Sequence, residues 1–116
     1  MKRRTFILAG FGLVSTGAAL AHHGWGSYDA SKVLTVASPV EKLQWQNPHV
    51  HIELRHEGAN WTAVLAPPFR MSARGLTPDM IKEGTEVSVE GYSSTQAQRE
   101  MRAERMKVSG KTFELR

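Results

Sequence analysis

The chain has 116 residues, of which 41% are hydrophobic, and it contains no cysteine. This length suits one small domain, and the lack of cysteine excludes disulfides, a thiolate metal site and a cysteine nucleophile. Because there is no cysteine, any transition-metal site must use imidazole, carboxylate, amine or thioether ligands. The 15 lysines and arginines exceed the 11 aspartates and glutamates, which gives a net charge of +4.

The first 21 residues have the pattern of an export signal. Residues 2–4 are Lys-Arg-Arg, residues 6–20 are apolar and uncharged, and residues 19–21 form an A-x-A cleavage site. The Arg-Arg-Thr-Phe-Ile run is also typical of a twin-arginine signal, so both export routes stay open. The stretch is too short and too rich in glycine for a membrane span. We expect cleavage after Ala21, a periplasmic mature protein and no stable membrane span after processing.

Removal of this signal changes the charge argument. Residues 1–21 hold three basic residues and no acidic residue, so the mature chain keeps 12 basic and 11 acidic residues. A net charge of +1 gives little electrostatic reason for binding to nucleic acid. We therefore expect no nucleic-acid partner.

The first predicted strand follows an N-terminal arm at residues 22–32 and opens a β domain over residues 33–116. Val36 and Val40 fall on even positions, whereas Leu43 and Trp45 fall on odd positions. A strand that changes its apolar face needs an extra residue, so we predict a β-bulge near residues 41–42.

The next elements follow from alternation and from turn residues. Asn47-Pro48 predicts a turn, and residues 50–54 alternate apolar and polar side chains as a half-buried second strand does. A third strand begins at Trp61 and ends at the two prolines at 67 and 68. Residues 68–74 predict a short helix, because Pro68 suits a first turn and Gly75 a C-terminal stop.

The last third of the chain returns to strands. Residues 77–84 predict one helical turn, followed by a fourth strand around residues 87–89 and a fifth at 101–108. This order predicts an all-β fold with one short helix, a small five-stranded OB-like barrel; a β-sandwich fragment is the alternative. The predicted core consists of Val36, Val40, Leu43, Val50, Ile52, Leu54, Val64, Val87 and Val89.

All five histidines lie between positions 22 and 56. His49 and His51 share one strand face, because side chains repeat every two residues, with Cα atoms roughly 6.5–7 Å apart. Cleavage after Ala21 would give His22 a free α-amine, so this amine and the His22 ring could bind one ion together. Such a nitrogen set favours Cu(II), with zinc less favoured, and His23 is a further candidate ligand.

Each candidate also has an ordinary explanation. His22 and His23 would also fit a frayed terminus, His49 and His51 a solvated strand face, and His56 a plain surface position. The methionines are spaced like core filler, and Asp29 suits either a turn or a contact to a histidine. Arg99, Arg102 and Arg105 alternate with glutamates, which favours a salt-bridged surface.

Three segments of the chain resemble a family of small exported bacterial proteins, domain of unknown function 6152. The segments are AHHGWGSYD, LQWQNPHVHI and RGLTPDMIKEGTEVSVEGY, and they cover nearly all of the mature chain. The matching residues are His22, His23, Trp45, Asn47, Pro48, His49, Arg74 and Gly75. Ser38-Pro39 departs from the family, where a Gly-Thr pair is more usual. The resemblance implies a compartment and a fold, and it brings no activity.

These observations predict an exported protein that binds a transition metal, copper, through His22 with His49 and either His23 or His51. We expect a carrier, sensor or accessory protein rather than an enzyme, with the metal ion and a periplasmic protein as partners. The alternative is a metal-free interaction or oligosaccharide-binding module on the same face of the barrel.

Overall fold

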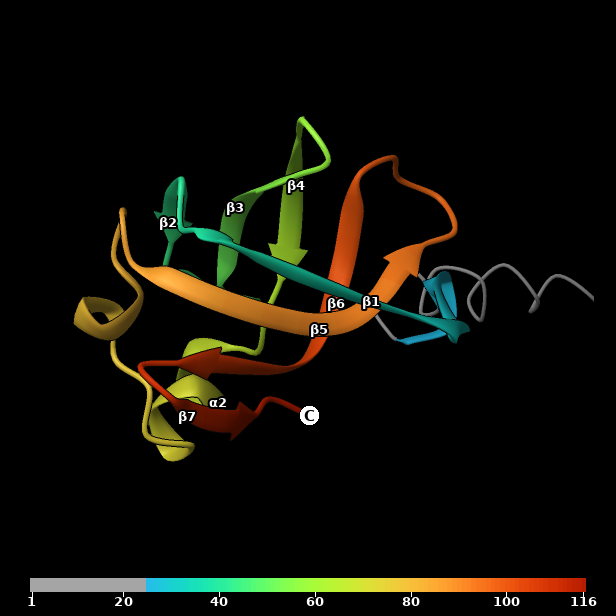
Figure 1. The fold of residues 1–116 in the computed structure, drawn as a ribbon. Coiled ribbons are helices and arrows are strands. Elements are labelled where there is room, and N and C mark those ends of the chain that lie inside the picture. The colour runs from blue at the N-terminus through green and yellow to red at the C-terminus, as the bar shows by residue number, and fades with distance from the viewer. Residues whose placement is uncertain (1–24) are drawn as a thin grey trace, which may run out of the picture.

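The computed structural model describes residues 25–116 (Figure 1). The predicted signal and cleavage site, and the histidines at 22 and 23, lie outside the described residues. None of the helices within residues 25–116 is long and apolar enough to cross a membrane.

Seven strands and three short helical segments make up this part of the chain. The strands are β1 (Tyr28–Pro39), β2 (Lys42–Gln44), β3 (His51–His56), β4 (Ala59–Val64), β5 (Glu86–Ser94), β6 (Glu100–Val108) and β7 (Lys111–Glu114). The helical segments are the 3-10 turn η1 (Trp25–Ser27), the α-helix α2 (Pro68–Ala73) and the 3-10 turn η2 (Pro78–Ile81).

The strands form one sheet in the order β1-β5-β6-β4-β3-β2, and β7 pairs with β6. Neighbours are antiparallel except for β4 and β6, which are parallel. The long strands β1 and β5 run side by side in Figure 1. The predicted all-β fold with one short α-helix is confirmed. The closed five-stranded barrel is not, because this path is open and has β1 and β2 at its two ends.

The bend in the first predicted strand explains the difference in strand number. The chain breaks at residues 40–41 into β1 and β2, next to the bulge that the alternation predicts at residues 41–42. The Val40 amide donates to the Thr85 carbonyl, and the next amide, of Glu41, donates to the Glu53 carbonyl. The backbone thus changes partner from the β5 side to β3 within one residue, and the predicted terminal extension forms the separate strand β7.

The Ser38 side chain supports this bend. Its hydroxyl accepts a hydrogen bond from the Arg55 amide at 2.9 Å and donates to the Pro39 carbonyl at 2.7 Å. Ser38 is 3% exposed. A buried hydroxyl in this position satisfies a β3 amide that the β1 backbone does not reach.

The core lies on the inner face of the sheet and agrees with the apolar alternation. Eight of the nine predicted core residues are buried; Val64, one of them, lies outside the core cluster, against which Leu43 is partly buried. The helix predicted over residues 68–74 spans Pro68–Ala73, with Met71 as its buried side chain. Gly75 ends it with a positive φ of 99°, a conformation that glycine adopts without a side-chain clash.

Candidate functional site

The predicted histidine His51 belongs to a row of residues that crosses four strands. His51 pairs with Val64, Val64 pairs with Arg102, and Arg102 pairs with Tyr92. Cross-strand partners lie on the same face of a sheet, so Ile52 and Leu54 face the core while this row occupies the other face. Because β3 begins at His51, His49 lies in the segment just before the strand.

Arg102 is the centre of this arrangement. Arg102 is 8% exposed, and its Nη2 lies 3.3 Å from Nε2 of His49. Since a guanidinium carries donors only, the histidine nitrogen accepts this hydrogen bond. Burial, ahead of the neighbouring charges, lowers the pKa of Arg102. Its buried Nε has no hydrogen-bond partner within residues 25–116.

Two arginines from the last part of the chain contact the Trp25 ring. The guanidinium carbons of Arg102 and Arg116 each lie 4.3 Å from the Trp25 ring centroid, a distance typical of cation–π contacts. Tyr92 meets the same ring edge-on, with centroids 6.0 Å apart. The start of the described chain is therefore held next to the Arg102–His49 contact.

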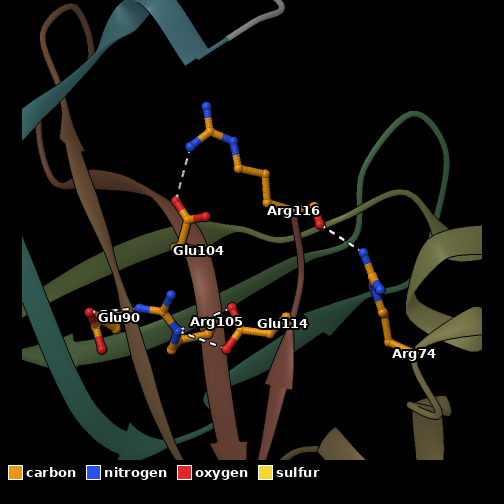
Figure 2. A network of polar contacts seen from close by, with 6 residues as sticks. All are labelled: Arg74, Glu90, Glu104, Arg105, Glu114 and Arg116. Carbon is orange, nitrogen blue, oxygen red and sulfur yellow. Dashed lines mark hydrogen bonds and ion pairs between the residues drawn. The ribbon is translucent and has the colours of Figure 1, made fainter.

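Two carboxylates lie near Arg102 but bond to other groups than its guanidinium. Arg116 Nη1 lies 3.3 Å from Glu104 Oε1, as Figure 2 shows. The hydroxyl of Tyr28 donates to Glu100 Oε2 at 2.7 Å. Within the described residues, neither glutamate forms an ion pair with Arg102.

The other arginines in Figure 2 have structural contacts. Arg105 reaches Glu90 through Nη1 and Glu114 through Nε, both at 2.9 Å, and Arg74 donates to the Arg116 carbonyl at 2.8 Å. The predicted salt-bridged surface is confirmed for Arg105. It is wrong for Arg102, which is buried and packs against Trp25 and His49.

The structure places one predicted metal ligand, His49, beside Arg102 and Trp25. His49 contacts Arg102, and His51 lies two strands from Arg102 in the same row. Over residues 25–116, no three His, Cys, Asp or Glu side chains gather closely enough to hold a metal ion. His22 and His23, predicted to complete the site, are outside these residues.

The remaining candidates have ordinary structural roles. The His56 ring packs edge-on against Trp61, with centroids 5.5 Å apart. Asp29, predicted in a turn or in contact with a histidine, lies instead in β1, where its carboxylate accepts a hydrogen bond from the Ser31 amide at 3.0 Å. The buried methionines Met71, Met101 and Met106 are core residues, as predicted.

Both tyrosines of the chain have a raised pKa. Burial, followed by the Glu100 hydrogen bond, raises the pKa of Tyr28, and the Glu104 hydrogen bond, followed by burial, raises that of Tyr92. In the unfolded chain both ionise at about 10. The corresponding stability is therefore present below this pH and is lost as the pH rises above it.

We expect an ultraviolet absorbance titration to show little tyrosinate in the folded protein at about pH 10. The same protein in urea should be close to half ionised at that pH. Because the two tyrosines are the only ones in the sequence, the signal needs no deconvolution from other tyrosines. Superimposable titration curves for the folded and unfolded protein would contradict the two glutamate contacts.

Comparisons with known proteins give a family and a fold. Residues 12–103 match the profile of DUF6152, described as a family of unknown function. No curated protein matches the chain in sequence. Among solved structures, the chain is similar to a crystal structure of TiaS in complex with an isoleucine transfer RNA and ATP, with 13% identity and a TM-score of 0.52. The match covers 77% of this chain and 20% of that chain, so it spans about a fifth of that protein and shows a likeness of fold.

Proposed function

The chain belongs to the DUF6152 family, whose function is unknown, and from its own residues we propose that it is an exported copper-binding protein. In this proposal, cleavage after Ala21 frees the α-amine of His22. The amine, the His22 ring and the His49 ring then bind one Cu(II) ion. His23 or His51 supplies a further nitrogen, and the protein acts in the periplasm as a copper carrier, sensor or accessory protein.

One observation carries the proposal: Trp25 lies against Arg102, and Arg102 contacts His49. His22 precedes Trp25 by three residues, a distance of at most about 11 Å for an extended chain. The mature terminus can therefore reach His49 without any change in the sheet. Trp25 itself contacts two arginines, which a frayed residue would not do.

The ligand chemistry supports copper over other ions. A chain without cysteine offers an amine and imidazoles, which form the planar or tetragonal nitrogen set that Cu(II) favours. Cu(II) also binds more tightly to such ligands than the other divalent ions of its row, zinc included.

The proposal includes an OB-like arrangement of the strands. The chain order of strands and helix, and the change of partner at residues 40–41, support it, because the first strand of such a barrel pairs in both halves. The usual binding face of that fold includes its second and third strands. Their counterparts here are β3 and β4, and His51 lies on this pair.

The test compares two forms of the protein that differ by one residue. Processed protein starting at His22 should bind one Cu(II) more tightly than Zn(II) in calorimetric titrations. Its EPR spectrum should be typical of Cu(II) bound mainly by nitrogen ligands. A form with one extra glycine before His22 should bind copper more than about tenfold more weakly, because the α-amine has moved away from the His22 ring. Equal affinities of the two forms would contradict the proposal, and so would a mature protein that starts elsewhere.

The alternative of a metal-free oligosaccharide-binding module also has one supporting observation. A hollow of about 290 Å³ lies between Trp61 and residues 93–100, and hydroxyl and amide side chains line it. An aromatic ring beside such groups can stack on and hydrogen-bond to a sugar. Processed protein that binds an oligosaccharide and no copper would favour this alternative.

A further inference from the structure

Arg102 is a buried guanidinium without the carboxylate partner that buried arginines usually have. It is 8% exposed, and among residues 25–116 its Nε–H donates to no acceptor. Its Nη2 lies 3.3 Å from Nε2 of His49, and its guanidinium carbon lies over the Trp25 ring. Neither of these two side chains carries a negative charge. Because buried charges in proteins are normally paired, Arg102 offers both a donor and a charge to an anion.

Two further arginines add positive charge around Arg102. The guanidinium carbons of Arg102 and Arg116 each lie 4.3 Å from the Trp25 ring centroid, so the two carbons are at most twice that distance apart. That limit is about one Debye length at physiological ionic strength. Burial lowers the pKa of Arg102, and the charges of Arg116 and Arg70 lower it further. Arg70, Arg102 and Arg116 therefore form an arginine cluster.

The glutamates of β6 do not neutralise this arginine cluster. Glu104 bonds to Arg116 at 3.3 Å through one terminal nitrogen, and Figure 2 shows the rest of that guanidinium directed away from the carboxylate. Glu100 accepts the hydroxyl hydrogen bond of Tyr28. Arg70 and Arg102 take part in none of the ion pairs found within residues 25–116. Three guanidinium groups thus share one paired carboxylate, and an excess of positive charge remains.

A small oxyanion matches this arrangement in charge and in hydrogen bonding. Phosphate and sulfate present several acceptor oxygens, and guanidinium N–H groups bind such oxygens through charge-assisted hydrogen bonds of about 2.7–2.9 Å. One oxygen can accept from the Arg102 Nε–H while Arg70 and Arg116 attract the anion through their charges. The contact of Arg102 Nη2 with His49 is left in place, because the anion uses a different nitrogen.

We propose that the arginine cluster is a binding site for a small oxyanion of the phosphate or sulfate kind, with the Nε–H of Arg102 as its central donor. The site consists entirely of described residues from α2, β6 and the end of the chain. It goes beyond the proposed copper function and does not depend on it.

The test is a phosphate titration of the metal-free mature protein at constant ionic strength, set with sodium chloride. ¹H–¹⁵N NMR follows the arginine Nε–H groups, and the Arg102 signal is identified by its loss in Arg102→Met. This signal should shift downfield and reach saturation, because its proton gains an anionic acceptor. The Arg105 signal should stay in place, since its Nε already donates to Glu114 at 2.9 Å.

Calorimetry of variants measures the contribution of each arginine. Arg102→Met should weaken phosphate binding by about tenfold or more, because it removes a charge-assisted hydrogen bond. Arg105→Met is the matched control: it removes the same charge from the same strand and should change the affinity by less than about twofold. Arg70→Gln is a second variant should Arg102→Met fail to fold, and it should weaken binding by about threefold through lost attraction alone.

The outcomes separate a specific site from general attraction to a positive surface. An Arg102 signal that does not move, or that moves no more than the Arg105 signal, would overturn the proposal. Equal phosphate affinities of Arg102→Met and Arg105→Met would do the same. A titration with glycerol phosphate distinguishes the sources of the ligand: tighter binding than inorganic phosphate indicates the phosphate group of a larger molecule, and weaker binding indicates the free ion. Because no metal is present, failure here leaves the copper proposal untouched.

Discussion

Gly91→Ala should lose a large part of the stability of the fold. Gly91 lies in β5 opposite Ala103 of β6, and a Cβ at this position would lie 1.9 Å from the Arg102 carbonyl oxygen and 2.9 Å from the Ala103 Cα. These are backbone atoms, so no change of rotamer relieves the clash and the strands must move apart. We expect a loss of about 4 kcal/mol or more, against a total of roughly 5–15 kcal/mol for such a domain.

Denaturant unfolding followed by circular dichroism measures this loss, and Gly26→Ala is the matched control. A Cβ at Gly26 would meet no atom within 4 Å, so this change should stay within about 0.5 kcal/mol of wild type. A Gly91→Ala protein as stable as Gly26→Ala would show that β5 and β6 are not as close as described. Because Arg102 supplies the obstructing carbonyl, Gly91→Ala should also disturb the candidate site.

Loss of the His49 ring should abolish tight copper binding. Changes to groups around a metal ligand cost about 10–100-fold in affinity, so loss of the ligand itself should cost more than about 100-fold. His49→Ala is measured by copper titration of the processed protein. His51→Ala, measured in parallel, decides whether this second histidine of the segment supplies a further nitrogen.

His56→Ala is the control for this series. Its ring packs against Trp61, so the change should lower the unfolding temperature and leave copper affinity unaltered. Circular dichroism confirms that each variant is folded before titration. Small and equal losses for all three histidines would instead indicate weak binding spread over a polar surface.

Local patterns predict the elements of this fold well. Alternation at Val50, Ile52 and Leu54 identifies the inner face of β3, and all three side chains are fully buried. Pro68 and Gly75 mark the ends of α2 within a residue or two. Each of these signals depends on backbone and burial rules that act over a few residues. These local signals can therefore be interpreted without knowledge of the tertiary structure.

The sheet path and the candidate site depend on pairings between distant segments. Arg102 resembles its neighbours in a charged stretch, and its burial follows only from the parallel pairing of β4 with β6 and the antiparallel pairing with β5. One extra residue in β6 changes the register there, because Glu90 pairs with Arg105 and Gly91 with Ala103. Alternation alone would therefore misplace Arg105 relative to Arg102. The contact of Arg102 with His49 could not be read from either local sequence.

The contact of Trp25 with two arginines sets an order of assembly. Trp25 precedes Arg102 by 77 residues and Arg116 by 91, so both cationic partners of its ring are distant in sequence. Closing such long loops costs conformational entropy that only a finished sheet repays. We therefore expect Trp25 to dock only after β6 has joined the sheet. In the proposed function, a copper site that depends on this contact would form only in the folded protein.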